Sequence, residues 1–331
     1  MTVTVRSFAK INLGLYIGAA RADGYHDLRT VYQTIALHDV IRVSMERNSG
    51  RSSGIEILCK DPQVPLDSSN TCYRMAERLM EELGAKGRVR IEIEKRLPVQ
   101  GGLGAASSNA VATMIALERA LKKRLSGATR LRIAAEVGSD LPLFLVGGTV
   151  LGVGRGEEVY PLADLPAIPM VIVTPEVGVS TAQAFADWDA RRSTSLEQLT
   201  GAGASDRLSE VGRALSAWLT SLTSGYPNTG APAKGGSRAG NLLSDLVRTG
   251  IENDFEKVVF PQYPELRDIK GSLERAGSRY ASLSGSGSTL YGLFRSAAEA
   301  AKAADRLRKR GVRAVATSGL TRQNYGKKIL A

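Results

Sequence analysis

The segment KRLPVQGGLGAASSNA, residues 95–110, joins a predicted strand to a predicted helix, and the fold is organised around it. The strand is Val89–Ile93, in which apolar and charged residues alternate. The helix is expected to begin at Ser107 and Ser108, because apolar residues then recur every three or four positions. Either serine could cap the helix or donate its hydroxyl to a phosphate or to magnesium.

The glycines of this segment favour an anion site. Glycine adopts positive φ angles and lets the backbone approach a phosphate closely. The free N–H groups and the dipole at the start of the helix also attract negative charge. A plain strand-to-helix turn would carry the same residues, so the segment alone leaves both interpretations open. It is not a Walker loop, because no Gly-Lys-Ser/Thr follows, and the protein-kinase signatures H-R-D and D-F-G are absent.

Three further segments are ambiguous when each is taken alone. Asp140, in GSDLPLF at 138–144, could hold a carboxylate over a cleft or cap the next turn. Lys10, in SFAKINLG at 7–14, lies in a predicted strand, where a lysine usually protects an edge or faces solvent. The turn SGSGS at 284–288 could join two strands of a hairpin and do nothing more.

The rest of the chain mixes strands and helices. Two strands are expected in the first 45 residues, within VTVRSFAKINLGLYIG and VYQTIALHDVIRVSM. Further strands are expected at Ile55–Leu58, Thr149–Val153, Met170–Thr174, Thr289–Phe294 and near Ala314, and helices at Tyr73–Leu83, Thr129–Val137, Leu242–Phe255, Tyr263–Ala276 and Ala297–Gly311. The stretch 224–240 is rich in Gly, Pro and Ser, and a mobile surface loop is expected there.

The composition is that of a globular protein with room for two domains. The 331 residues are 43% apolar and 23% charged, and no apolar run is long enough to span a membrane. The N-terminus lacks the pattern of a secretory signal, and two cysteines are too few for a disulfide framework or a zinc site. Cys59 and Cys72 are therefore expected to be reduced, buried thiols of a cytoplasmic protein.

The net charge of +11 is compatible with a nucleic acid, an anionic membrane or a small phosphorylated molecule as partner. The densest basic stretches, Lys122–Arg124 and Lys302–Arg313, are interleaved with apolar residues, as on solvated helix faces. Aromatic residues make up only 5% of the chain, which argues against a surface that stacks single-stranded bases. We therefore expect neither a nucleic-acid partner nor a membrane partner.

Taken in order, these segments resemble the GHMP kinase superfamily, named for galactokinase, homoserine kinase, mevalonate kinase and phosphomevalonate kinase. The resemblance covers essentially the whole chain. Within the superfamily the sequence looks most like the 4-diphosphocytidyl-2-C-methyl-D-erythritol kinase family. The grounds are AKINLGLYIG (9–18), RADGYHDLRTVYQ (21–33), the loop at 95–110, GSDLPLFLVGGTVLGVGRGE (138–157), NDFE (253–256) and LSGSGSTLYGLF (283–294). RADGYH is the segment that most separates this family from the other members.

The resemblance implies an α+β fold with two domains. Residues 1–158 would form an ATP-binding N-terminal domain similar to ribosomal protein S5, and residues 159–331 a ferredoxin-like C-terminal domain. ATP, accompanied by Mg²⁺, and a cytidyl diphosphate substrate would meet between them. The γ-phosphoryl group would pass to the 2-hydroxyl of the erythritol portion, a step of non-mevalonate isoprenoid biosynthesis.

The same resemblance implies roles for individual residues. Asp140 would accept the hydroxyl proton, and Lys10 would stabilise the developing alkoxide and keep Asp140 ionised. The phosphates of ATP would be bound by the loop residues Pro98, Val99, Gln100, Gly101, Gly102, Leu103, Gly104, Ala105, Ala106, Ser107 and Ser108. No pair of carboxylates is evident as a dedicated magnesium site.

The substrate would be held largely by aromatic residues. Tyr25 and Phe185 would sandwich the cytosine ring, and His26 would hydrogen-bond its polar edge. Without the resemblance, His26 would be interpreted as a histidine in a D-G-Y-H turn. Tyr32 would pack at the pocket wall, and Asn12 would reach the polar end of the substrate.

Other positions are less clearly marked. Asn70 and Lys95 are candidates for the adenine side, and His38 belongs to no motif and is expected to be structural. The family's loop usually contains more glycine, where this chain has Gln100 and the alanines at 105–106. Because extra methyl groups restrict positive φ angles, the shape of the loop is where a departure is first expected.

Two alternatives stay open. One keeps the fold but replaces the acceptor with homoserine or a mevalonate derivative, for which the aromatic residues and His26 would have no purpose. The other is a basic nucleic-acid-binding protein of S5-like fold without catalysis, whose binding to RNA would fall steeply with salt.

Overall fold

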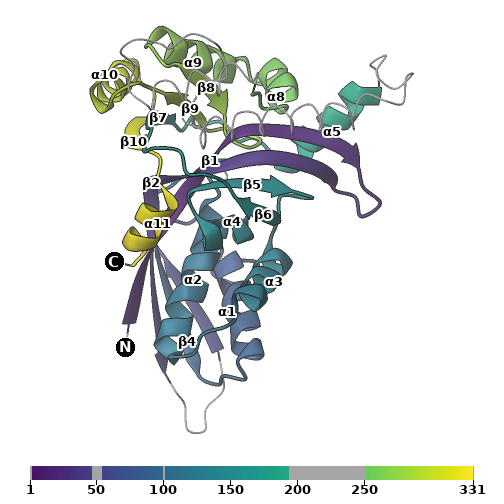
Figure 1. The fold of residues 1–331 in the computed structure, drawn as a ribbon, viewed down its shortest axis with the longest axis vertical. Helices are drawn as coiled ribbons and strands as arrows, with labels where there is room; N and C mark the ends of the chain where they lie inside the picture. Colours follow the sequence, from purple (N-terminus) through teal and green to yellow (C-terminus); the bar gives the residue numbers. More distant parts are fainter. Residues whose placement is uncertain (1, 47–53, 100, 194–250, 331) are drawn as a thin grey trace.

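The computed structural model describes residues 2–46, 54–99, 101–193 and 251–330 (Figure 1). Gln100, the predicted loop at 224–240 and most of the predicted helix Leu242–Phe255 lie outside the described residues. Two sheets, each with its own helices, lie one above the other along the long axis of the molecule. The predicted α+β fold in two parts is confirmed.

The first sheet is built on a long antiparallel hairpin. β1 (Thr2–Ala20) pairs along most of its length with β2 (His26–Glu46). The sheet is completed by β3 (Gly54–Cys59), β4 (Arg88–Glu94), β5 (Thr149–Val153) and β6 (Glu158–Pro161), in the order β3-β4-β2-β5-β6. The helices α1 (Thr71–Glu82), α2 (Ala105–Leu121), α3 (Gly127–Val137) and α4 (Leu141–Val146) share one apolar core with these strands. Alternate side chains of β4 enter this core, which is why its pattern was readable in the sequence.

The second sheet is antiparallel and has the order β10-β7-β9-β8. Its strands are β7 (Pro169–Val173), β8 (Tyr280–Leu283), β9 (Leu290–Leu293) and β10 (Ala314–Ser318). The helices α5 (Thr181–Ser193), α8 (Glu256–Gln262), α9 (Pro264–Arg275) and α10 (Ala297–Arg308) contribute to its core. The last helix, α11 (Arg322–Lys328), returns to the first sheet, where Leu330 forms a β-bridge with Val5 (Figure 1).

A third apolar cluster joins the two sheets. Ile11 and Leu13 of β1 pack there with Ile172 of β7 and Tyr291 of β9. β1 is therefore buried on both of its faces, and this position places the middle of β1 at the junction of the two layers. The domain boundary between residues 158 and 159 stays a prediction; the strand β6 of the first sheet begins at that point.

Several local predictions were wrong. α2 begins at Ala105 rather than at Ser107, and its N-cap is Gly104, with φ of 68° and no side-chain cap. The two alanines thus belong to the first turn of the helix, which suits them, and need no positive φ. Residues 251–255 are not helical, because α8 starts only at Glu256. The helices α4, α5, α8 and α11 were not predicted.

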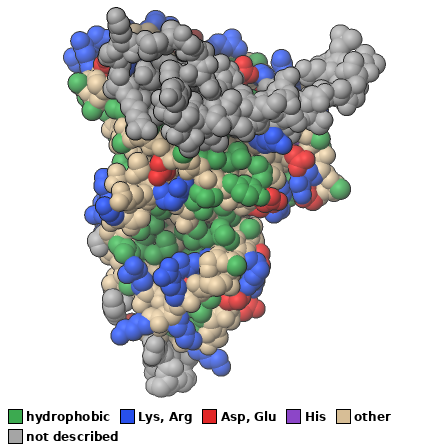
Figure 2. Space-filling model, viewed as in Figure 1, with side chains coloured by type: hydrophobic (Ala, Val, Ile, Leu, Met, Phe, Trp, Pro, Cys, Tyr) green, Lys and Arg blue, Asp and Glu red, His purple; other side chains and the backbone are tan. Residues whose placement is uncertain are grey.

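The expectations drawn from composition can also be compared with the structure. Cys59 and Cys72 are free thiols, and burial raises the pKa of Cys72 to about 12, but Cys59 is only half-buried. No described helix is long and apolar enough to cross a bilayer. On the face shown in Figure 2, lysine and arginine side chains are interspersed with hydrophobic and neutral ones.

Candidate active site

Lys10 lies in the interior of the molecule, although it belongs to a strand. Only 3% of the residue is exposed. Its Nζ donates to Asn12 Oδ1 at 2.7 Å and lies 3.3 Å from Asp140 Oδ2. The interpretation of Lys10 as an edge or solvent-facing lysine is therefore wrong. A buried ammonium needs such partners, because desolvation otherwise favours its neutral form.

Asp140 stands at the start of α4, just after the glycine that ends α3. Its side chain makes no capping hydrogen bond, so the interpretation as a simple cap is wrong. Its Oδ1 accepts a hydrogen bond from the Tyr32 hydroxyl at 3.0 Å, and 33% of the side chain stays exposed. Burial and the charge of Asp140 hold the pKa of Tyr32 well above its ordinary value, so the tyrosine remains a donor. The carboxylate is thus oriented from two sides and still open to the cleft.

Asn12 links Lys10 to the neighbouring strand. Its Oδ1 accepts from Lys10, and its Nδ2 donates to the Thr30 hydroxyl at 2.7 Å. Thr30 in turn donates to the carbonyl oxygen of Gly14 at 2.8 Å. Both ends of the amide are therefore engaged in holding the lysine, although Asn12 also lines a cavity. A direct contact between Asn12 and substrate stays a prediction.

The glycine loop passes directly beside Lys10. A Cβ on Gly104 would lie 3.1 Å from Lys10 Cε, and φ of +68° at this position excludes most other residues. The N–H groups of Gly102, Leu103 and Gly104 donate to no described residue. The first N–H groups of α2 have no partner within the helix either. The loop can therefore bind an anion next to the Lys10–Asp140 pair.

The turn at 284–288 holds the middle of this loop. Ser284 Oγ donates to the carbonyl oxygen of Gly102 at 3.0 Å, and the Thr289 N–H donates to that of Gly101 at 3.3 Å. A Cβ on Gly102 would come within 2.1 Å of the Ser284 carbonyl oxygen. The turn does join β8 to β9 in a hairpin, but it also connects the second sheet to the loop. Its loop contacts contradict the interpretation that it is only a hairpin.

A cavity of about 750 Å³ opens beside the Lys10–Asp140 pair. All five predicted substrate-binding residues, Asn12, Tyr25, His26, Tyr32 and Phe185, line it, together with Lys10 and Asp140. The ring of Phe185 stacks on that of His26, with centroids 5.0 Å apart, and the Tyr25 ring faces the guanidinium of Arg155 at 5.0 Å. The sandwich of a base between Tyr25 and Phe185 stays a prediction.

Two charged residues of this cavity were missed by sequence reasoning. Asp189 Oδ1 lies 2.7 Å from His26 Nε2 and so fixes the imidazole. Arg155, in the turn after β5, donates from Nε to Glu157 at 3.1 Å. A signal for Arg155 was available, because glycines flank it in the quoted segment GRGE, whereas Asp189 lies in an unremarkable stretch of α5.

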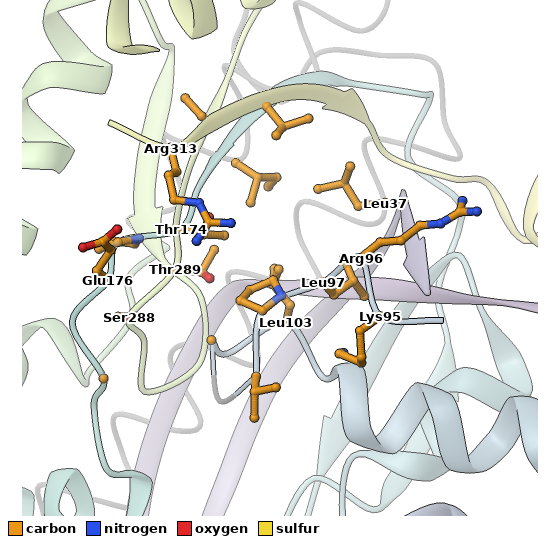
Figure 3. Close-up of a pocket in the computed structure, with 18 of the residues that line it drawn as sticks. Leu37, Lys95, Arg96, Leu97, Leu103, Thr174, Glu176, Ser288, Thr289 and Arg313 are labelled. Carbon is orange, nitrogen blue, oxygen red and sulfur yellow. The ribbon is translucent and has the colours of Figure 1, made fainter. Parts of the chain in front are cut away.

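A larger cavity, of about 1160 Å³, lies on the other side of the loop (Figure 3). Of the predicted ATP-binding residues, Pro98, Val99, Gly101 and Leu103 line this cavity, Gly102, Gly104 and Ser107 line the smaller one, and Ala105, Ala106 and Ser108 line neither. The loop thus separates two cavities. Lys95 lines the larger one, but Asn70 does not, because its side chain caps α1. His38 lies at its wall and donates from Nδ1 to the Ala36 carbonyl oxygen, 3.0 Å away.

The described residues contain no group of three His, Cys, Asp or Glu side chains that could hold a metal ion by themselves. Ser107 faces the smaller cavity, whereas the Ser108 hydroxyl is buried and accepts from Ser7 at 2.8 Å. Neither serine is the N-cap of α2, so the prediction of a serine cap was wrong.

Comparison with known proteins is consistent with this arrangement. The family model described as "GHMP kinases N terminal domain" matches residues 70–148, and "GHMP kinases C terminal" matches residues 236–313. These matched ranges include the glycine loop, Asp140 and the turn at 284–288. The fold is thus that of the GHMP kinase class.

Individual relatives narrow the class. The 4-diphosphocytidyl-2-C-methyl-D-erythritol kinase of Solibacter usitatus is 38% identical, over 88% of this chain and 81% of the relative. The enzyme of the same name from Synechococcus sp. (strain JA-2-3B'a(2-13)) is 36% identical, over 92% of this chain and 89% of the relative. A crystal structure of 4-(cytidine 5'-diphospho)-2C-methyl-D-erythritol kinase superposes with a TM-score of 0.70 at 28% sequence identity. The match covers 96% of this chain and 98% of the chain in that structure. The chain therefore belongs to the 4-diphosphocytidyl-2-C-methyl-D-erythritol kinase family. A homoserine kinase from Cytophaga hutchinsonii, 19% identical with a TM-score of 0.70, shares the fold alone.

Proposed function

We propose that this kinase transfers the γ-phosphoryl group of ATP to the 2-hydroxyl of 4-diphosphocytidyl-2-C-methyl-D-erythritol. The observation that carries the proposal is the Lys10–Asp140 pair, 3.3 Å apart, where the anion-binding loop meets the smaller cavity. Phosphoryl transfer depends mainly on positioning and charge stabilisation. A carboxylate and an ammonium beside a phosphate site meet that requirement.

Asp140 acts as the general base. The acceptor hydroxyl reaches the exposed side of the carboxylate and gives up its proton there as the bond to phosphorus forms. Lys10 stabilises the negative charge on the acceptor oxygen, and its ion pair with Asp140 holds that carboxylate in place. Asn12 and Tyr32 hold the pair from the buried side through their hydrogen bonds of 2.7 and 3.0 Å.

ATP spans the glycine loop. The larger cavity is ample for the adenosine portion, with Lys95 at its wall, and its volume exceeds what a small ligand requires. The triphosphate lies along the free N–H groups of the loop and the start of α2, which neutralise its charge. The γ-phosphate then points toward Asp140.

Magnesium accompanies the nucleotide. Mg²⁺ prefers an octahedral set of oxygen ligands that includes several waters and substrate phosphates. The described residues fit such a complex, because the Ser107 hydroxyl faces the smaller cavity and no dedicated cage exists among them. When bound, Mg²⁺ supplies positive charge to the phosphate oxygens.

The acceptor's diphosphate meets Arg155. Lys10 and Arg155 are the two lysine or arginine side chains among the described residues that line the smaller cavity, and Lys10 is paired with Asp140. Arg155 is held by Glu157 through Nε, and its terminal amino groups donate to no described residue. They are therefore available to bind a phosphate bidentately.

The base is selected by His26. The Asp189 carboxylate can only accept a hydrogen bond, so it selects the Nε2–H tautomer of the His26 imidazole, in which Nδ1 is an acceptor. An acceptor suits the exocyclic amino group of cytosine and opposes the carbonyl oxygen of uracil at the same place. Homoserine and mevalonate offer neither group.

Turnover with different acceptors tests the proposal. Purified protein with ATP and Mg²⁺ should release ADP with 4-diphosphocytidyl-2-C-methyl-D-erythritol and not with homoserine or mevalonate. ADP formation confined to one of the other alcohols, or none with well-folded protein, contradicts it. RNA binding whose affinity falls steeply with salt and does not change when Lys10 or Asp140 is replaced would favour the nucleic-acid alternative.

We place the reaction in the cytoplasm, where free thiols such as Cys59 and Cys72 persist.

A further inference from the structure

Asp39 is a fully buried carboxylate that the proposed chemistry leaves unused. It lies in β2, next to the position where the pairing of β2 with β4 ends at Val40 and Glu94. Its Oδ1 accepts hydrogen bonds from the backbone N–H groups of Arg96 at 2.7 Å and Leu97 at 2.8 Å. The side chain thus continues the hydrogen bonding of the strand pair up to the first residues of the glycine loop.

The other oxygen of Asp39 reaches the far end of the same loop. Oδ2 accepts from Asn109 Nδ2 at 3.0 Å and from Lys95 Nζ at 2.5 Å. Asn109 lies in the second turn of α2, which follows the loop. One carboxylate therefore binds the segment that enters the loop and the helix that leaves it.

The two ends of the loop and its middle are held by different parts of the molecule. Ser284 and Thr289 of the second sheet hold the carbonyl oxygens of Gly102 and Gly101. Asp39 holds the residues on either side from within the first sheet. A loop anchored at these points presents its N–H groups in one arrangement, which lowers the ordering cost of binding a triphosphate.

Asp39 also places a positive charge. Lys95 is nearly buried beside Asp39, with 9% of its side chain exposed, and lines the larger cavity (Figure 3). The ammonium has three N–H groups and gives one to Asp39, so others are available to a ligand in the cavity. Without the carboxylate, the ammonium would lose its buried counter-charge, which would favour an outward rotamer.

We propose that Asp39 is a positioning residue for the nucleotide: it fixes both ends of the phosphate loop and the place of Lys95. The proposal rests on the proposed binding of ATP by this loop. It implies that loss of the carboxylate weakens binding on the nucleotide side and leaves the acceptor side unchanged. A merely structural carboxylate would instead lower stability and weaken all ligands alike.

Asp39→Asn tests this, with Glu94→Gln as the matched control. The asparagine keeps the shape but turns an amide N–H₂ toward the donors Lys95 and Asn109. Glu94 is a partly exposed carboxylate at the end of the neighbouring strand β4, paired with Arg42 and Arg96. Calorimetry with Mg²⁺ and a non-hydrolysable ATP analogue should show affinity lower by about tenfold or more in Asp39→Asn, because charge-assisted hydrogen bonds are lost. Binding of cytidine diphosphate in the smaller cavity should change less than about twofold in both variants, and the KM for ATP should rise without a rise in the acceptor KM.

Two results overturn the proposal. One is a folded Asp39→Asn protein that binds the ATP analogue within about twofold of wild type; the other is an equal loss for the analogue and for cytidine diphosphate. If Asp39→Asn does not fold, Asn109→Leu decides, because it removes one of the four hydrogen bonds and keeps the branching and number of side-chain heavy atoms. That variant should bind the analogue about threefold more weakly or worse, and unchanged binding overturns the proposal. A wild-type protein that binds the analogue but phosphorylates no acceptor contradicts the proposed function alone.

Discussion

Replacing Asp140 by asparagine removes the proposed base while preserving its surroundings. The asparagine carbonyl can still accept the Tyr32 hydroxyl, which is now 3.0 Å from Oδ1. Lys10 loses its ionic partner at 3.3 Å but keeps Asn12 Oδ1 at 2.7 Å. Since a third of the Asp140 side chain is exposed, the free energy of unfolding should fall by only about 1–3 kcal/mol.

The effect on turnover should be far larger than the effect on stability. A positioned general base contributes about 10²–10⁴-fold to the rate, so kcat of Asp140→Asn should fall by that factor, or about 3–5 kcal/mol in activation free energy. Asp140 lines the smaller cavity and not the larger one. The KM for ATP should therefore stay within about threefold of the wild-type value, which corresponds to a change of no more than about 0.6 kcal/mol in binding free energy.

A coupled assay of ADP release measures both constants. Asp187→Asn is the control, because Asp187 lies on α5 outside both cavities and bonds only Gln183 and Gln262 among the described residues. It should keep wild-type kinetics. The reasoning is refuted if folded Asp140→Asn retains kcat within tenfold of wild type, or if its defect lies only in the KM for ATP.

Three other changes test the site. Gly102→Ala would place a methyl group 2.1 Å from the Ser284 carbonyl oxygen at φ of +74°, so unfolding free energy should fall by about 2–4 kcal/mol; an unchanged melting temperature contradicts this. Arg155→Gln should raise the KM for the diphosphate acceptor about tenfold with kcat and the KM for ATP unchanged, as steady-state kinetics will show; an unaltered acceptor KM removes Arg155 from the site. Asp189→Ala should lower the kcat/KM preference for a cytosine over a uracil acceptor about tenfold, whereas Asp189→Asn, which can still accept from His26, should keep it; equal preferences in all three proteins speak against this tautomer control.

The pairing of Lys10 with Asp140 could be inferred only from the order of the motifs. Local reasoning favoured an exposed lysine, because most lysines in strands face water. The structure buries Lys10 since β1 lies between two layers and has no solvent face at that point. Nothing in the alternation of a single strand reveals a second sheet packed on its other side.

Two carboxylates missed by sequence reasoning, Asp189 and Asp39, depend on partners that are remote along the chain. His26 and Asp189 are separated by 163 positions, and Lys95 and Asp39 by 56. Each carboxylate lies in a stretch that also fits an ordinary strand or helix, so its role exists only once the chain has folded. Pairs of residues that are far apart in the sequence leave no periodic pattern in it.

The start of α2 was misplaced because two local preferences compete. Serine favours the N-cap, which pointed to Ser107 and Ser108, whereas alanine favours the helix interior. The structure follows the alanines, with Gly104 at the N-cap in a left-handed conformation. The tight approach of Lys10 to Gly104 explains why a glycine rather than a serine holds that position.

The most direct test of the account is the identity of the phosphorylated product. The wild-type protein should convert 4-diphosphocytidyl-2-C-methyl-D-erythritol, ATP and Mg²⁺ into ADP and an acceptor heavier by one phosphoryl group, with phosphorus NMR placing the new monoester on the 2-hydroxyl. A phosphate found on another hydroxyl, or an acceptor recovered unchanged while ATP is bound by folded protein, would contradict the geometry proposed for Lys10 and Asp140.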